Sequence, residues 1–151
     1  MATVTRTRRI LHATDFSPAS RRAHSHARAR AGRDGARLLI LHVLTPPSPF
    51  VGGGRPAPAS YLDLLAAARH DARRRLAALL ARTRAAGIRA ETKLVEGGPA
   101  VEVVKAAGRW HADVVVIGSH GRTGVSRFLL GSVAEQVVTR SARPVLTVRS
   151  R

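Results

Sequence analysis

The stretch ADVVVIGS, residues 112–119, carries the strongest strand signal in the sequence. Its centre, 114–117, is three valines and one isoleucine in a row, and β-branched side chains favour extended backbone. Because no polar side chain alternates with them, both faces of this strand should be covered by protein. A strand of this kind belongs in the middle of a parallel sheet with helices on both sides, so the stretch predicts an α/β fold.

The segment that follows this strand is longer than a simple connection requires. It reads GSHGRTGVSRFLLGS, residues 118–132, and contains four glycines. Strand-to-helix loops in compact domains usually have about 2–6 residues. The extra length and the glycines indicate that this loop has a function of its own.

Strand and helix signals alternate along the rest of the chain. The first helix should begin with Ser17 as its N-cap, and the longest with a capping box formed by Ser60 and Asp63, whereas 45–60 should be a surface loop. This alternation predicts one domain, residues 1–151, with an open parallel sheet and helices on both faces. The expected strands are 8–14, 36–44, 88–97, 112–119 and 143–149, and the expected helices are 17–32, 60–86, 99–110 and 132–141.

The composition excludes several classes of protein. There is no cysteine, so disulfides and thiolate metal sites are not available. His24 and His26 stand two positions apart on an expected helix and should point to different faces, so no metal site is expected there. No apolar run approaches the roughly 20 residues of a membrane-spanning helix. We therefore expect a cytoplasmic protein with no membrane attachment.

The formal net charge of +17 has two interpretations. One is a polyanion partner such as nucleic acid. The other is a compositional bias toward arginine on solvated surfaces. The second fits a chain whose basic residues are spread over every expected helix and whose aromatic residues, which stack on bases, make up only 3%. We prefer the second interpretation and do not expect nucleic acid as a partner.

The long loop leaves the carboxyl end of a central parallel strand, where open parallel sheets bind their ligands. We expect its glycines, Gly118, Gly121, Gly124 and Gly131, to adopt backbone angles that turn N–H groups toward a ligand. Ser132 should stand at the N-terminus of the next helix, where the helix dipole favours an anion. The loop therefore predicts a phosphate-binding site.

At this point the residues resemble the universal stress protein family. The pattern Gly118-x2-Gly121-x9-Gly131-Ser132 is similar to that of the ATP-binding branch of the family. Four further segments, ATDFSPAS at 13–20, LHV at 41–43, VEGGPA at 95–100 and PVLTV at 144–148, extend the resemblance over nearly the whole chain.

The resemblance implies a fold and a ligand. The fold is Rossmann-like, of the adenine nucleotide alpha hydrolase type, with sheet order 3-2-1-4-5. The ligand is ATP, with Mg²⁺ as an optional companion, and Asp15 would lie near the adenosine while Val43 would contact adenine. The resemblance places the ribose and phosphates among the residues of the loop and of the following helix. The full set of binding residues expected is Ala13, Thr14, Asp15, Val43, Gly118, Ser119, His120, Gly121, Arg122, Gly131, Ser132 and Val133.

The acidic residues bear on whether the chain is an enzyme. Of the nine Asp and Glu, only Asp15 and Glu96 are expected near the ligand edge of the sheet, which is few for phosphoryl transfer. Asp15 has an alternative role as a cap of the first helix, and His120 is not expected to act in acid–base chemistry. We therefore expect a nucleotide-dependent stress-response or signalling module with slow or no hydrolysis. The alternatives are a slow ATP hydrolase and an arginine-rich polyanion-binding protein.

The closing strand, 144–149, predicts a homodimer. In the order 3-2-1-4-5 this strand lies at an edge of the sheet, and it carries little charge on either face. Unprotected edge strands pair with other chains unless they are covered. The family resemblance implies the same contact.

Overall fold

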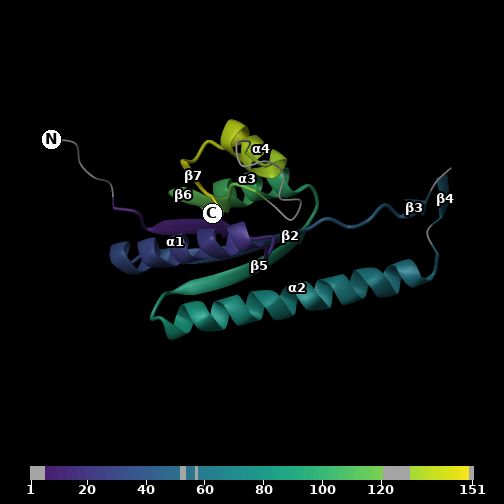
Figure 1. The fold of residues 1–151 in the computed structure, drawn as a ribbon, viewed down its shortest axis with the longest axis horizontal. Helices are drawn as coiled ribbons and strands as arrows, with labels where there is room; N and C mark the ends of the chain where they lie inside the picture. Colours follow the sequence, from purple (N-terminus) through teal and green to yellow (C-terminus); the bar gives the residue numbers. More distant parts are fainter. Residues whose placement is uncertain (1–5, 52–53, 57, 121–129, 150–151) are drawn as a thin grey trace.

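The computed structural model describes residues 6–51, 54–56, 58–120 and 130–149 of the chain, in which strands and helices alternate around a five-stranded sheet (Figure 1). The five strands of this sheet are β1 (Arg9–Ala13), β2 (Arg37–Leu44), β5 (Ala90–Glu96), β6 (Val114–Gly118) and β7 (Val145–Val148). The helices are α1 (Pro18–Asp34), α2 (Ser60–Ala85), α3 (Pro99–Arg109) and α4 (Ser132–Arg140). A two-stranded ribbon, β3 (Phe50–Val51) with β4 (Arg55–Pro56), lies within the stretch that was expected to be an irregular loop.

The strand order confirms the predicted topology. All five strands are parallel and follow the order β5-β2-β1-β6-β7, which is 3-2-1-4-5 when they are numbered along the chain. Ala13, the last residue of β1, pairs with Leu41 on one side and with Ile117 on the other. The chain thus builds the sheet outward from β1 in one direction and then in the other. The strand order reverses between β1 and β6, which is where ligands bind in sheets of this type.

The helices cover the two faces of the sheet in pairs. Helices α1 and α2 lie on one face, and α3 and α4 lie on the other (Figure 1). Alternate strand residues serve the two layers, because successive side chains of a strand point to opposite faces. Leu11 and Val115 pack toward α3 and α4, whereas Ile10 and Val116 pack toward α1 and α2. All four are fully buried, and each side chain of this kind contributes about 1.5–3 kcal/mol of burial free energy.

Two helix ends differ from the sequence-based expectation. Helix α1 does not end at Gly32 but continues to Asp34, and Gly35 takes the left-handed conformation at φ 63° that ends it. Gly32 is exposed, so it costs the helix only about 1 kcal/mol relative to alanine and does not break it. The capping box at Ser60 is wrong as well, because Ser60 is already helical and its predecessor Ala59 makes no side-chain cap. The Ser17 cap is confirmed, with its Oγ accepting from the Ser20 N–H at 3.2 Å.

A small polar group is buried between the sheet and the layer of α1 and α2. The rings of His12 and His24 meet edge to face at 5.4 Å between centroids, and His24 Nε2 lies 3.0 Å from the Thr83 hydroxyl. Burial, with a smaller contribution from neighbouring His24, lowers the pKa of His12 to about 3, so its ring is neutral. His26 is exposed on another side of α1, as the i and i+2 spacing predicts.

Candidate functional site

A cavity of about 360 Å³ opens at the carboxyl edge of the sheet, which we define as the line of strand ends at Ala13, Leu44, Glu96, Gly118 and Val148. Its walls are the ends of β1, β2 and β6 together with the first turns of α3 and α4. Gly121 and Arg122 lie outside the described residues. Every other residue of the expected binding set lines the cavity: Ala13, Thr14, Asp15, Val43, Gly118, Ser119, His120, Gly131, Ser132 and Val133.

The turn after β1 is held by side chains of its own. The Thr14 Oγ1 lies within hydrogen-bond distance of the Ser20 hydroxyl and accepts from the Phe16 N–H at 3.1 Å. The Asp15 carboxylate accepts from the N–H of the helix cap Ser17 at 2.9 Å. Phe16 adopts φ 64°, a left-handed angle that costs a bulky residue free energy. Such an angle persists only where the surrounding contacts offset that cost. Asp15 therefore has the local structural role considered above, and it also faces the cavity.

Gly118 lets the end of β6 approach α1 closely. A Cβ atom at this position would come within 3.0 Å of the Ala19 carbonyl carbon and of the Ser20 nitrogen, both of which are backbone atoms. Gly118 does not adopt a left-handed angle, and Gly131 is extended at φ −61° and ψ 149°. Neither described glycine of the loop therefore needs the left-handed conformation that only glycine adopts easily. Close packing explains Gly118, and helix entry in an extended conformation explains Gly131.

The two ends of the long loop are tied together. The Gly131 N–H donates to the Ser119 carbonyl at 2.6 Å, and the Ser119 N–H donates to the Val148 carbonyl at 2.8 Å. Ser119 is buried, with its hydroxyl 2.9 Å from His120 Nδ1. These contacts place His120 and the start of α4 at the same wall of the cavity.

Two helix N-termini meet the cavity without side-chain caps. Helix α3 begins after Gly98, and α4 begins after Gly131, and neither cap residue makes a side-chain hydrogen bond. The first N–H groups of a helix have no partner within it, and the helix dipole adds a partial positive charge there. The residues Pro99, Ser132 and Val133 bring both ends to the cavity wall. This combination favours an anionic group.

The cavity contains little negative charge. Asp15 is the carboxylate among its described lining residues. Glu96, the other acid expected nearby, forms a two-pronged ion pair with Arg69, and this hydrogen bond lowers the pKa of Glu96. Among the described residues, no group of three or more His, Asp or Glu side chains is arranged to hold a metal ion.

Several lining residues escaped sequence analysis. His42 anchors the end of β2, with its Nδ1 2.7 Å from the Thr14 carbonyl oxygen, and Pro99 and Val103 present one face of α3. The segment VEGGPA marks the start of α3, and β2 is the neighbour of β1, so a signal for this wall existed in the sequence. The lining residues that were not expected are Ser20, Leu41, His42, Leu44, Thr45, Pro99, Val103, Ile117 and Ala134.

Comparison with known proteins agrees with this geometry. The model of the universal stress protein family matches residues 6–149. This chain belongs to the universal stress protein family. It is 34% identical over 142 residues to universal stress protein MJ0531 of Methanocaldococcus jannaschii, which covers 94% of this chain and 82% of the relative.

Solved structures of family members share the fold. The structure of MJ0577 from the same organism superposes with a TM-score of 0.82 at 26% identity and covers 97% of this chain and 99% of that one. A universal stress protein solved in complex with cAMP has a TM-score of 0.68 at 28% identity, covering 97% of this chain and all of that one. In the part of this chain that is described, no helix is long and apolar enough to cross a membrane.

Proposed function

We propose that this universal stress protein binds ATP in the cavity at the carboxyl edge and acts as a nucleotide-dependent module in a stress response. The observation that carries the proposal is the meeting of two uncapped helix N-termini with the ends of β1 and β6 in one cavity. Positive helix ends bind phosphates, and the reversal of strand order is the expected place for a nucleotide. The complex of a related protein with cAMP supports an adenine nucleotide as the ligand class.

The lining residues divide into an apolar part and a polar part. Val43, which packs against the core from β2, offers an apolar surface for adenine, and Asp15 offers a carboxylate to ribose hydroxyls. Main-chain N–H groups at Ser132 and Val133 would receive the phosphates. Ala13, Thr14, Ser119 and His120 complete the walls in this proposal, and Gly121 and Arg122 belong to it from the family pattern alone.

Hydrolysis should be slow or absent. Mg²⁺ binds through one or two carboxylates plus phosphate oxygens and water, so Asp15 could share an ion carried by ATP. Phosphoryl transfer also needs a residue that positions the attacking water, and the described lining offers no second carboxylate for that task. The alternative is a slow ATP hydrolase, in which the bound nucleotide would turn over.

Thermal unfolding with ATP tests the proposal. Ligand at 100 times its Kd stabilises the folded state by about 2.7 kcal/mol, so ATP should raise the melting temperature in a concentration-dependent way. Gly131→Val keeps an allowed backbone angle but puts a branched side chain where phosphates would approach, and it should abolish the shift. Thr139→Val, on the exposed side of the same helix, is the matched control and should keep the full shift. An unmoved melting curve for the folded wild-type chain with ATP and ADP would refute nucleotide binding.

Phosphate release separates the module from the enzyme. With ATP in excess over the protein, we expect a rate of phosphate release below roughly 1 per second per protein molecule, which is the lower end of typical kcat values for enzymes. A rate in the ordinary enzyme range that Asp15→Asn removes would favour the hydrolase.

We also propose that two copies pair through the strand at 144–149. Strand β7 lies at the edge of the sheet, and Leu146 on it and Val138 on the neighbouring helix are both exposed. The Pro144 carbonyl accepts from Val115 of β6 and the Val148 carbonyl from Ser119 just after it, so the alternate N–H groups at Val145 and Thr147 face outward. A two-fold axis would pair them with the same strand of a second copy.

Sedimentation at tens of micromolar tests this pairing. Thr147→Pro removes an outward donor and should yield monomers, while Thr147→Val, which keeps the N–H, should remain dimeric. A wild-type chain that sediments as a monomer would refute the pairing.

A further inference from the structure

Arginines gather at the edge of the sheet opposite the cavity. We define this amino edge by the strand starts Arg9, Arg37, Ala90, Val114 and Val145. Segments that are far apart in the sequence bring basic side chains to these starts, because parallel strands all begin at one edge. The arginines at or just before strand starts are Arg6, Arg8, Arg9, Arg37, Arg89 and Arg143.

The helices add to the same charge. Each helix runs back along the sheet and ends at the amino edge, and its last turn is basic. The helix-end arginines have a structural explanation, since positive charge stabilises the negative end of the helix dipole. The same explanation covers Arg6, Arg9 and Arg89, whose side chains donate to carbonyls at the C-terminal ends of α1 and α3. Among the described contacts, Arg8, Arg37 and Arg143 make no such bond to a helix end, so the explanation does not extend to them. The helix-end arginines are Arg33, Arg82, Arg84, Arg109 and Arg140.

Several of these guanidinium groups are held in place without losing their charge. The Arg6 Nε donates to the Asp34 carbonyl at 2.8 Å, and the Arg9 Nη1 donates to the Trp110 carbonyl at 2.9 Å. The Arg89 Nη2 donates to the Gly35 carbonyl at 2.8 Å. A carbonyl oxygen is neutral, and a guanidinium has five N–H donors, so each group keeps its charge and most of its donors.

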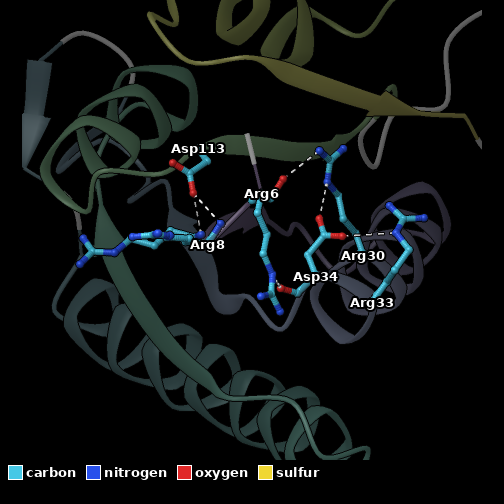
Figure 2. Close-up of polar contacts among 8 residues, drawn as sticks. Arg6, Arg8, Arg30, Arg33, Asp34 and Asp113 are labelled. Atoms are coloured by element: carbon cyan, nitrogen blue, oxygen red, sulfur yellow. Dashed lines mark hydrogen bonds and ion pairs between the residues drawn. The ribbon is translucent and has the colours of Figure 1, made fainter. Parts of the chain in front are cut away.

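The few carboxylates at the amino edge already have partners. Asp113 accepts from the main-chain N–H groups of Arg8 and Arg9 at 2.7 and 2.9 Å. Figure 2 shows Arg30 and Arg33 both directed at the carboxylate of Asp34. Glu91 accepts from the Trp110 indole N–H at 2.8 Å and lies 3.4 Å from the Arg37 guanidinium. A large excess of positive charge remains for an external partner.

We propose that the amino edge binds the phosphate backbone of duplex DNA without sequence preference. Four strand spacings of about 4.8 Å make the edge about 19 Å wide. At 3.4 Å of helix axis per base pair this width spans about five or six base pairs of a duplex. The planar, forked guanidinium is also the side chain best suited to phosphate oxygens.

Two other anionic partners fit the edge less well. Membrane surfaces are bound by apolar side chains inserted beside basic ones, and the described strand starts expose no large apolar side chain. Single strands are held by aromatic stacking. The nearby aromatic residue, Trp110, is half-buried and lies under Arg9, whose guanidinium carbon is 5.9 Å from the ring centroid. The placement of the arginines thus favours a nucleic-acid partner, which the composition alone did not favour. This site is separate from the proposed nucleotide site and does not depend on it.

Fluorescence anisotropy with a labelled 20-base-pair duplex of arbitrary sequence tests the proposal. Arg8→Gln/Arg109→Gln removes two exposed charges of the amino edge for which the structure gives no side-chain partner. In 50 mM salt this variant should bind about tenfold more weakly than the wild-type chain, and its slope of log K against log[salt] should be shallower by about 2.

The matched control removes the same charge from elsewhere. Arg22 lies in the first part of α1, and Arg73 acts electrostatically on Glu96 at the end of β5, so both are on the carboxyl side of the molecule. Arg22→Gln/Arg73→Gln should keep wild-type affinity and slope. Equal weakening by both double variants, no weakening by Arg8→Gln/Arg109→Gln, or no measurable wild-type binding would overturn the proposal. Tighter binding to a single-stranded 20-mer or to vesicles with anionic lipid would overturn it in favour of those partners.

Discussion

The two edges of one sheet have opposite chemistry. At the carboxyl edge, uncapped helix N-termini surround a cavity with Asp15 as its described carboxylate. At the amino edge, helix C-termini and strand starts carry arginines, of which Arg6, Arg9 and Arg89 are anchored to main-chain carbonyls. The parallel α/β topology creates this contrast, because it sorts every strand end to one edge and every strand start to the other. Residues with no sequence proximity thereby share a surface.

The free energy of unfolding should fall in acid, because the layer buried between the two edges contains histidines that are neutral in the folded chain. Burial lowers the pKa of His12 from 6.5 to about 3 and also lowers that of His24. The unfolded chain therefore binds protons that the folded chain does not, and stability is present above pH 6.5 and is lost as the pH falls toward 3. His12 should contribute about 1.4 kcal/mol of lost stability per pH unit in this window, and His24 adds a loss of the same sign below pH 6.5.

The variant His12→Asn should flatten that loss. An asparagine amide can replace the contact between His12 Nδ1 and the Val116 carbonyl at 3.1 Å, but it does not titrate. His26→Asn, at an exposed position on α1, is the control and should retain the wild-type slope. Urea unfolding from pH 7 to pH 4 measures both. Equal slopes for His12→Asn and the wild-type chain would show that His12 does not carry the effect.

A glycine-to-alanine substitution should change the free energy of unfolding in opposite directions at the two edges. Gly118→Ala at the carboxyl edge forces a Cβ against the backbone of α1 at 3.0 Å, and overpacking of this kind costs about 1–3 kcal/mol. Gly108→Ala, in the last turn of α3 at the amino edge, meets nothing within 4 Å and should stabilise the helix by about 0.5–1 kcal/mol. Denaturant midpoints of the two variants give the comparison. A Gly118→Ala protein as stable as the wild-type chain would show that the close approach of β6 and α1 is dispensable.

The sequence predicted the carboxyl edge better than the amino edge. The valine run of β6 and the glycine pattern after it are local signals, and they correctly marked the strand and the cavity wall at Ser132. The end of α1 was missed because a solvent-exposed Gly32 resembles a helix stop, and only the left-handed angle of Gly35 decides the matter. The arginine surface was not predicted, because Arg8, Arg37 and Arg89 meet only through the pairing of β1, β2 and β5.

The smallest expected effect concerns the independence of the two edges. From Arg9 to Ala13, β1 advances four residues, which separates the edges by about 13 Å along the strand. The Debye length is about 8 Å at physiological ionic strength, so charges at one edge are largely screened from the other. Arg8→Gln/Arg109→Gln should therefore change the Kd for ATP by less than about twofold while it weakens DNA binding. Gly131→Val should instead weaken ATP binding and change the Kd for duplex DNA by less than about twofold. Isothermal titration with ATP, in the presence and absence of duplex DNA, measures this coupling. A large shift of ATP affinity on DNA binding would mean that the sheet transmits a conformational change, since screened charge alone cannot account for it.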